Sequence, residues 1–216
     1  MRKCLPDSDI YVILSDLHSA GRGNIETARL LLEAGIKIVQ YREKGFQISR
    51  KYEECLAIRE LCLQHDACFI VNDDAALAFA VAADGLHIGQ DDLPPREARK
   101  IIGEEMLLGL SVTTPLEIDA ALKDPAVDYL GVGPVFATAT KPDASPPGGL
   151  ELLDYAVRNS QLPIVAIGGI KLENISRVAG RGIRYFAMVS DLVSAEDIAR
   201  RVVNLRAQCT KKNTSV

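Results

Sequence analysis

Short apolar segments alternate with longer helix-forming segments along most of this chain, and that alternation limits the folds available to it. Eight segments have the length and apolar composition of buried strands: residues 10–14, 35–39, 68–71, 85–88, 106–110, 128–132, 163–167 and 183–189. Continuously apolar strands are typical of parallel strands covered on both faces. Eight strands alternating with eight helices within about 200 residues predict a single-domain α/β fold, a (β/α)8 or TIM barrel.

The segments between the strands carry helix signals. The expected helices comprise residues 24–34, 49–65, 75–82, 94–102, 115–122, 150–157, 174–179 and 195–205. Asn24 and Asn174 are expected to cap the helices that begin there, and the Pro94-Pro95 pair opens another. An open doubly wound sheet is the alternative architecture, but no GxGxxG motif follows the first strand, as its dinucleotide-binding form would require.

The length of the chain sets the domain organisation. With 216 residues and 48% hydrophobic content, it can bury one sizeable core, so one domain is expected. Residues 1–9 are expected to be an N-terminal extension, residues 10–206 the catalytic barrel, and residues 207–216 a disordered tail.

Charge and cysteine usage exclude several classes of function. The net charge of −4 and the pI of about 5.5 provide no global basic field for nucleic acid, so an anionic ligand must be held by local cations. The five cysteines are odd in number and form no CxxC pair, which is typical of thiols in a reducing cytosol. The N-terminus lacks the apolar core of a signal peptide, and the longest apolar run, residues 75–83, is too short to span a bilayer. We therefore expect a soluble cytoplasmic protein with no membrane or nucleic-acid partner.

A dense polar cluster, Gln40-Tyr41-Arg42-Glu43-Lys44, follows the second expected strand. Arg42 and Lys44 are two residues apart, so on extended backbone their side chains point to the same side. Two cations at the end of a buried strand can clamp a phosphate. A solvated strand end with an internal ion pair explains the cluster equally well when it is taken alone.

Carboxylates end the third and fourth expected strands. Asp73 and Asp92 would converge at the mouth of a barrel beside the two cations, an arrangement that suits Mg²⁺ held partly by phosphate oxygens. Each aspartate could instead cap the helix that follows it, and for a single aspartate that is the favoured interpretation. Asp74 and Asp91 are the alternative ligands within each pair.

Two later loops carry phosphate-binding signals. Gly168-Gly169 follows the seventh expected strand, and the loops after strands seven and eight are the usual phosphate site of this fold, although a tight turn would also use two glycines. The loop over residues 133–149 contains hydroxyl groups and Lys141, and is expected to be a mobile flap that brings one cation to the ligand.

The remaining chemically versatile side chains have ordinary explanations. His87 lies inside the fourth expected strand and is interpreted as a hydrogen-bonded core residue. His18 and His65 are interpreted as surface residues, and Cys55 and Cys62 as core residues on one helix stripe. No Ser-His-Asp or Cys-His combination is evident.

The motifs taken together resemble those of the thiamine phosphate synthase family. The resemblance covers roughly residues 10 to 200 and rests on seven motifs in order: QYREK (40–44), VNDD (71–74), HIGQDD (87–92), GLS (109–111), GVGPVF with TATK (131–141), IGGI (167–170) and MVS (188–190). It implies an alkyl-transferring enzyme that joins hydroxymethylpyrimidine diphosphate to thiazole phosphate, or to its carboxylated form. The products would be thiamine phosphate and pyrophosphate, with CO₂ from the carboxylated form.

The resemblance also implies a role for individual residues. The pyrimidine diphosphate would be held by Gln40, Tyr41, Arg42, Glu43, Lys44, Asn72, Ser111 and Lys141. The thiazole phosphate would be held by Thr138, Ala139, Thr140, Gly169, Val189 and Ser190. Asp73 and Asp92 would bind Mg²⁺, and the catalytic residues would be Arg42, Lys44, Ser111 and Lys141. The chief departure is Val112-Thr113-Thr114, where family members often carry a histidine.

Two other functions compete with this one. A thiazole tautomerase-like isomerase would use the same barrel but would need neither a diphosphate clamp nor a metal pair. A non-catalytic phosphate-binding barrel would need an exposed apolar patch for its partner. The sequence leaves both a monomer and a homo-oligomer open.

Overall fold

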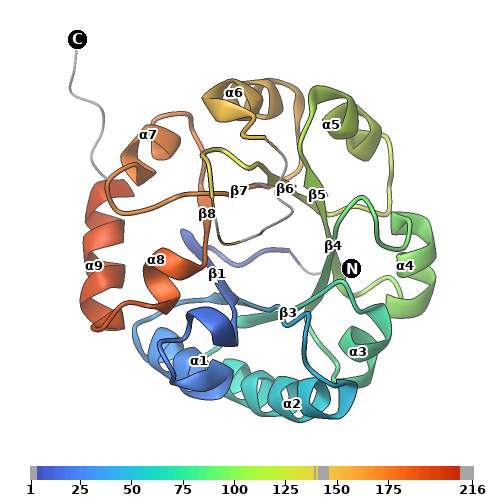
Figure 1. Ribbon diagram of the computed structural model, residues 1–216. Helices are drawn as coiled ribbons and strands as arrows, with labels where there is room; N and C mark the ends of the chain where they lie inside the picture. The colour runs from blue at the N-terminus through green and yellow to red at the C-terminus, as the bar shows by residue number, and fades with distance from the viewer. Residues whose placement is uncertain (1–3, 139, 141–145, 210–216) are drawn as a thin grey trace.

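The computed structural model describes residues 4–138, 140 and 146–209, and in it eight parallel strands close into a barrel (Figure 1). The strands are β1 (Ile10–Leu14), β2 (Ile38–Tyr41), β3 (Cys68–Asn72), β4 (Gly85–Ile88), β5 (Leu107–Val112), β6 (Tyr129–Val132), β7 (Ile164–Ala166) and β8 (Tyr185–Met188). Each strand pairs with the next one in sequence, and β1 also pairs with β8. This closure confirms the (β/α)8 prediction and excludes the open sheet.

Helices form a ring around the strands (Figure 1). They are α1 (Gly23–Glu33), α2 (Ile48–Gln64), α3 (Ala75–Ala80), α4 (Pro95–Ile102), α5 (Pro115–Leu122), α6 (Gly149–Asn159), α7 (Ile175–Ala179), α8 (Ser190–Val193) and α9 (Ile198–Cys209), with a 3-10 turn η1 (Asp16–His18). The short helix α8 directly follows β8 and was not expected from the sequence. No helix among the described residues is both long and apolar enough to cross a membrane.

Neither of the two asparagines that were expected to cap helices makes a side-chain capping bond. The prediction for Asn24 is wrong, because α1 already begins at Gly23 with Arg22 at its N-cap. Asn24 is buried within the helix, where its amide donates to the carboxylates of Glu43 and Glu54. Asn174 does occupy the N-cap of α7, but its side chain bonds back to the preceding loop and makes no capping bond to the helix.

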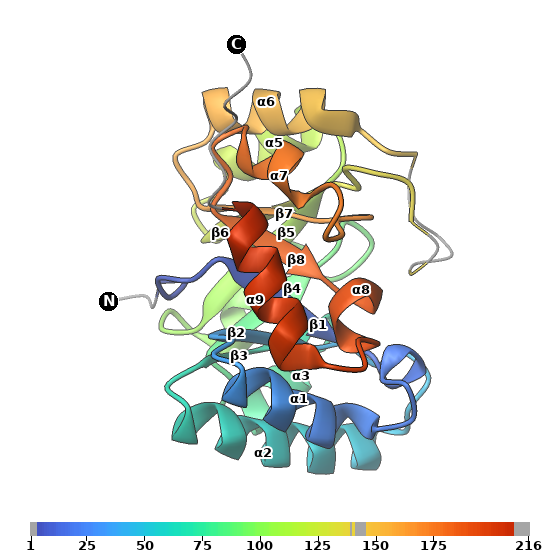
Figure 2. The ribbon, with the colours of Figure 1, turned by 90° about the vertical axis from the view of Figure 1, so that its left-hand side faces the viewer.

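Strand residues alternate between the outer layer and the barrel interior, as the pleat requires. The outer layer packs against the helices and contains most of the core, including Cys55 and Cys62, as expected. A separate interior cluster comprises Leu5, Tyr11, Ile13, Ile38, Ile70, Leu107, Tyr129, Val165, Tyr185 and Ala187. Leu5 lies just before β1 and packs in this interior cluster. The N-terminal segment therefore closes the end of the barrel opposite α8 (Figure 2).

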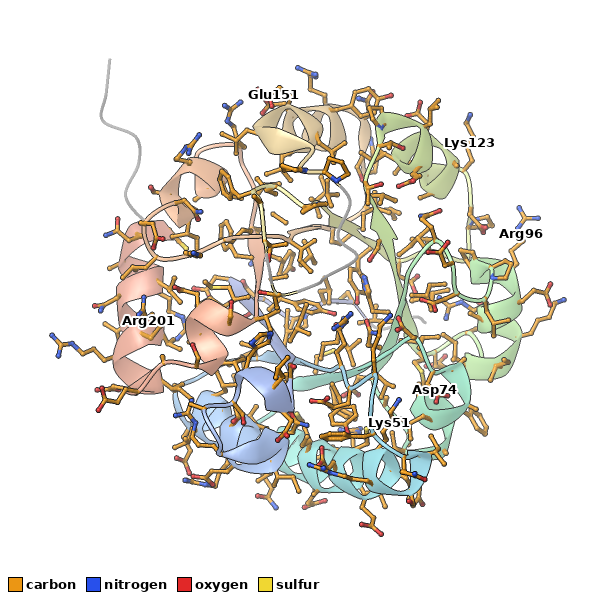
Figure 3. The ribbon with its side chains drawn as sticks, viewed as in Figure 1. Lys51, Asp74, Arg96, Lys123, Glu151 and Arg201 are labelled. Atoms are coloured by element: carbon orange, nitrogen blue, oxygen red, sulfur yellow. The ribbon has the colours of Figure 1, made fainter. Side chains whose placement is uncertain are left out.

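Charged side chains concentrate outside the ring. Arg96, Lys123 and Glu151 project outward from the helical layer in Figure 3. The interior is instead filled by apolar, aromatic and hydrogen-bonded side chains, so the cavity described below occupies only one end of the barrel.

Two glycines make room for large side chains in the interior. A Cβ atom at Gly109, on β5, would lie 2.1 Å from Cζ of Tyr129 and 2.5 Å from Nδ1 of His87. A Cβ atom at Gly131, on β6, would lie 2.9 Å from Cε1 of His87. The phenol and the imidazole therefore meet above backbone that carries no side chain.

The Gly109→Ala variant is expected to lose about 1–3 kcal/mol of unfolding free energy, because the added methyl group overpacks a space already filled by two rings. Urea denaturation measures the loss. Gly45→Ala is the control, since its added Cβ would have no heavy atom within 4 Å. Equal denaturation midpoints for the two variants would contradict this account of the interior.

Candidate active site

A cavity of about 690 Å³ opens at the carboxyl ends of the strands, within the usual size range of small-molecule sites. Loops from around the barrel line it, which is where this fold carries its chemistry. The predicted site residues that line it are Gln40, Arg42, Lys44, Asn72, Asp73, Asp92, Ser111, Thr138, Thr140, Gly169, Val189 and Ser190. Ala139 and Lys141 lie outside the described residues.

Strand β2 aims its cations into this cavity. The strand comprises Ile38–Tyr41, whereas residues 35–39 were predicted. Gln40 therefore belongs to the strand itself and does not follow it. Gln40, Arg42 and Lys44 all line the cavity, as expected of residues two apart on extended backbone. The ammonium group of Lys44 lies 3.5 Å from the Asp73 carboxylate.

The two intervening residues of the cluster face the helices instead. Tyr41 is buried, and its hydroxyl donates to Oε2 of Glu54, on α2, at 3.0 Å. The Glu43 carboxylate accepts hydrogen bonds from the backbone N–H of Asp16 and from the Asn24 amide. Neither side chain is among those lining the cavity. They fasten the end of β2 to α1 and α2.

Asp73 and Asp92 lie together at the mouth. Burial raises the pKa of the Asp73 carboxyl, and the neighbouring Asp92 carboxyl raises it further, while Lys44 and Arg42 act in the opposite direction. The Asp92 carboxylate also accepts a hydrogen bond from the backbone N–H of Gly89 at 2.7 Å. This pair of carboxylates therefore favours binding of a cation between them.

Asp74, the alternative to Asp73, caps a helix. Its carboxylate accepts the backbone N–H of Leu77 at 2.9 Å and caps α3. Figure 3 shows it at the beginning of that helix. Asp91, the alternative to Asp92, also lines the cavity.

The carboxylate pair fits a magnesium ion. Mg²⁺ prefers oxygen ligands and commonly takes one or two carboxylates, completing its shell with water and substrate phosphate. No group of three or more acidic, histidine or cysteine side chains suitable for a metal occurs in the described part of the chain. Asp73 and Asp92 would thus supply a partial shell, which suits a metal that a phosphorylated ligand helps to bind.

A hydrogen-bonded histidine forms part of the cavity floor. The ring of His87 is largely buried, with Nδ1 3.0 Å from the Tyr129 hydroxyl and Nε2 2.9 Å from the Ser111 hydroxyl. Burial lowers the pKa of the imidazole to about 4, so the ring is neutral at pH 7. The expectation of a hydrogen-bonded core histidine is confirmed, although the ring also borders the cavity.

Four further contributors were not expected from the sequence. Tyr11, on β1, lines the cavity, and its hydroxyl oxygen lies 2.9 Å from that of Tyr129, on β6, in the barrel interior. His18, interpreted as a surface residue, is half-buried on the cavity wall, and Lys171 adds a cation from the loop after β7. In the sequence, only the alternation of inward-facing and outward-facing strand residues could have indicated that the tyrosines face the barrel interior. No local signal marks His18 as a cavity residue.

The loops after β6, β7 and β8 meet on the other side of the cavity. Gly168 and Gly169 have φ values of 98° and 64°, and a Cβ atom at Gly169 would lie 2.6 Å from the Ala137 carbonyl oxygen. The hydroxyl groups of Thr140, after β6, and Ser190, after β8, lie 3.2 Å apart. Glycine is therefore required here for a close approach of backbone, which leaves peptide groups accessible to an anion.

The segment that departs from the family pattern also reaches the cavity. Thr113 donates both its backbone N–H and its hydroxyl to Oε2 of Glu117, at 2.6 and 2.9 Å. Both residues line the cavity. A hydrogen-bonded threonine–glutamate pair therefore forms part of the cavity wall.

The closed barrel, with a polar cavity at the carboxyl ends of its strands, places this chain in the class of (β/α)8-barrel enzymes. The family model for thiamine monophosphate synthase matches residues 10–192. The thiamine-phosphate synthase of Pelotomaculum thermopropionicum is 50% identical over 208 residues, covering 96% of this chain and 95% of that one. That of Caldicellulosiruptor bescii is 45% identical over 196 residues, covering 91% and 89%. The chain belongs to the thiamine monophosphate synthase family, and it is a transferase of thiamine biosynthesis.

Solved structures agree with this assignment. Thiamine phosphate pyrophosphorylase from Pyrococcus furiosus superposes with a TM-score of 0.85 at 33% identity, covering 94% of this chain and 96% of that one. The 3-hexulose-6-phosphate synthase of Salmonella typhimurium reaches a TM-score of 0.70 at 16% identity, covering 93% and 98%, and shares the fold alone.

The Asp73→Asn variant is expected to be more stable than the unsubstituted protein when metal is absent. A raised carboxyl pKa destabilises the fold as pH rises above the ordinary aspartate value, and the amide removes this effect. Asparagine also tolerates the φ of 63° found at this position. At pH 7, differential scanning calorimetry with EDTA should show a higher melting temperature for Asp73→Asn than for the unsubstituted protein.

Asp74→Asn is the matched control, because asparagine caps a helix as well as aspartate does. Its stability should stay within about 0.5 kcal/mol of the unsubstituted protein. A melting temperature for Asp73→Asn at or below that of the unsubstituted protein would show that burial and the Asp92 carboxyl do not raise the pKa of Asp73.

Proposed function

We propose that this chain joins hydroxymethylpyrimidine diphosphate to thiazole phosphate, or to its carboxylated form, and releases thiamine phosphate and pyrophosphate. The observation that carries the proposal is a single cavity with two separate anion-binding sides. One side has the cations and carboxylates that follow β2, β3 and β4, and the other has the glycine and hydroxyl groups that follow β6, β7 and β8. Two phosphorylated substrates can therefore enter with their anionic groups apart and their reacting rings together.

The pyrimidine diphosphate belongs on the first side. Arg42 and Lys44 can bind its phosphates, because charged donors make the strongest hydrogen bonds to phosphate oxygens. Gln40, Asn72 and Ser111 line the same region and offer neutral polar groups. Tyr41 and Glu43 support the ligand indirectly, by holding the end of β2 against α1 and α2.

Asp73 and Asp92 would hold Mg²⁺ together with the diphosphate. The metal would neutralise part of the charge that grows on pyrophosphate as it leaves. Arg42 and Lys44 contribute to the same stabilisation as fixed cations in the cavity. Lys141 is proposed as a third cation, brought by the loop after β6.

The thiazole phosphate belongs on the second side. The turn at Gly169 and the hydroxyl groups of Thr138, Thr140 and Ser190 suit an uncharged cradle for a phosphate group. Ala139 and Val189 complete the proposed contacts. Lys171 lies on this side as well and can neutralise the phosphate charge.

The proposed reaction needs no general base for the nucleophile. His87 has hydrogen-bond partners at both ring nitrogens. A thiazole nitrogen already carries the lone pair that forms the new carbon–nitrogen bond, so no proton has to be removed. The chain would thus act by positioning the two substrates and by stabilising the leaving group.

The competing functions lack support of this kind. An isomerase would have no use for the carboxylate pair or for cations on the first side, and relatives at 41–50% identity are thiamine-phosphate synthases.

The proposed substrates are soluble phosphorylated molecules, which supports the cytoplasm as the location of this protein.

Formation of thiamine phosphate tests the proposal directly. Purified protein, both substrates and Mg²⁺ should give thiamine phosphate and pyrophosphate, as measured by liquid chromatography. Asp73→Asn and Asp92→Asn should each lose at least about tenfold in activity at limiting Mg²⁺, the scale observed even for indirect changes at metal sites. Asp74→Asn should keep its activity. The absence of product from the unsubstituted protein would reject the function, and full activity of both ligand variants would reject the metal site.

The carbon–oxygen bond to pyrophosphate is expected to break before the carbon–nitrogen bond forms. The proposed cations and Mg²⁺ would stabilise the leaving group, and the thiazole nitrogen needs no activation, so positive charge should build up on the pyrimidine methylene. An electron-withdrawing ring substituent of similar size should then slow the chemical step severely, each tenfold being about 1.4 kcal/mol of barrier. Single-turnover rates at saturating thiazole phosphate provide the measurement. Nearly equal rates for the natural substrate and the analogue would indicate direct displacement.

A further inference from the structure

A chain of hydrogen bonds crosses the barrel interior beneath the cavity. The Gln40 amide on β2 donates to the Tyr11 hydroxyl on β1 at 2.8 Å, and that hydroxyl lies 2.9 Å from the hydroxyl of Tyr129 on β6. Tyr129 in turn lies 3.0 Å from Nδ1 of His87 on β4, whose Nε2 lies 2.9 Å from Oγ of Ser111 on β5. The chain links five strands and both of its ends line the cavity. We name these five side chains the interior relay.

The direction of the relay follows from counting hydrogens. Gln40 uses an amide hydrogen on Tyr11, so the single hydroxyl hydrogen of Tyr11 is available for Tyr129. The hydrogen of Tyr129 is then directed to Nδ1 of His87, which must be the unprotonated ring nitrogen. A neutral imidazole has one N–H, and it therefore lies on Nε2 and donates to Ser111.

The two ends of the relay present opposite hydrogen-bonding groups to the cavity. Ser111 accepts from His87, so its own hydroxyl hydrogen is left to donate to a ligand. Gln40 has turned its amino group toward Tyr11, so its carbonyl oxygen is left to accept. Reversing the relay would require the Gln40 amide to turn over, and it would exchange donor and acceptor at both ends together.

We propose that Tyr11, Tyr129 and His87 are positioning residues. The two tyrosines hold His87 as the Nε2–H tautomer, and His87 in turn directs the Ser111 hydroxyl hydrogen into the cavity. The role toward ligand rests on the proposed function. An aminopyrimidine diphosphate has a donor in its amino group and acceptors in its phosphates, which matches an acceptor at Gln40 and a donor at Ser111. The relay thereby couples recognition of the two parts of one substrate.

The interior is built to accommodate this network. The rings of Tyr129 and His87 occupy the space above Gly109 and Gly131, where a Cβ atom would collide with one or both of them. Both rings are buried, and the three bonds that join Gln40, Tyr11, Tyr129 and His87 are buried as well, so they form away from competing water and an unsatisfied partner would be costly. None of the relay atoms is among the buried polar atoms left without a partner in the described part of the chain.

Nitrogen-15 NMR of histidine-labelled, ligand-free protein tests the direction without any catalysis. The ring nitrogens of His87, assigned by loss of their signals in His87→Gln, should show a protonated Nε2 and an unprotonated Nδ1. A protonated Nδ1, or a mixture of the two tautomers, would overturn the proposal.

The Gln40→Glu variant should reverse the relay from its far end. An ionised carboxylate can only accept, so Tyr11 must donate to it, and His87 should become the Nδ1–H tautomer in spectra recorded at about pH 8, where carboxylates are ordinarily ionised. Gln90→Glu is the matched control. Gln90 also lines the cavity but bonds to the Ser111 carbonyl oxygen outside the relay, so His87 should remain Nε2–H. An unchanged tautomer in Gln40→Glu would show that the tyrosines do not transmit the orientation.

A double-mutant cycle provides a second, kinetic test that does not depend on folding of Gln40→Glu. Tyr129→Phe should lower kcat/KM for the pyrimidine diphosphate by about tenfold, the worth of one well-placed hydrogen bond. In a Ser111→Ala background the same change should cost no more than about twofold, because the relay acts through Ser111. Tyr185→Phe, which removes an interior hydroxyl bonded to the Pro6 carbonyl oxygen, should have no effect in either background. Equal losses from Tyr129→Phe in both backgrounds would overturn the coupling. Failure of the unsubstituted protein to form thiamine phosphate would reject the proposed function, while the NMR result would still decide the relay.

Discussion

Closure of the sheet by the pairing of β1 with β8 is the constraint on which the rest of this structure depends. Ile10, Tyr11 and Val12 register with Phe186, Ala187 and Met188, joining the first strand to the last. Once the sheet is closed, every second strand residue faces a common axis, and all the strands end around one opening. Residues far apart in sequence then share a single cavity, which is why the two anion-binding sides can face each other.

The cluster after β2 shows how the same short segment serves both the fold and the site. Gln40, Arg42 and Lys44 face the cavity, while Tyr41 and Glu43 bond to Glu54 and Asn24 on the surrounding helices. Catalytic groups require support from side chains that are themselves held in place. The alternation of the strand places those two functions on opposite faces, so neither interferes with the other.

Small residues are as necessary as large ones in the interior. Gly109 and Gly131 leave space in which the rings of Tyr129 and His87 can meet, and Gly168 and Gly169 bring the backbone of the β7 loop close to that of the β6 loop. A methyl group at any of these positions would displace backbone or a buried ring. The cavity therefore takes its shape from where side chains are missing as well as from those present.

The sequence by itself determined the eight alternating strand–helix units, because apolar strands and amphipathic helices are local patterns that repeat along the chain, whereas the pairing of β1 with β8 that closes them into a barrel is a tertiary contact. It also predicted the end of the barrel that carries the polar groups, since the residues after each strand are visible in sequence. Only the tertiary structure decided that Asp74 caps α3 while Asp73 faces the cavity, that Asn24 bonds to Glu43 and Glu54, and that Tyr11 meets Tyr129 from 118 residues away. Such contacts depend on the register between strands and on the packing of helices around them, and these are fixed only when the closed barrel brings distant segments together.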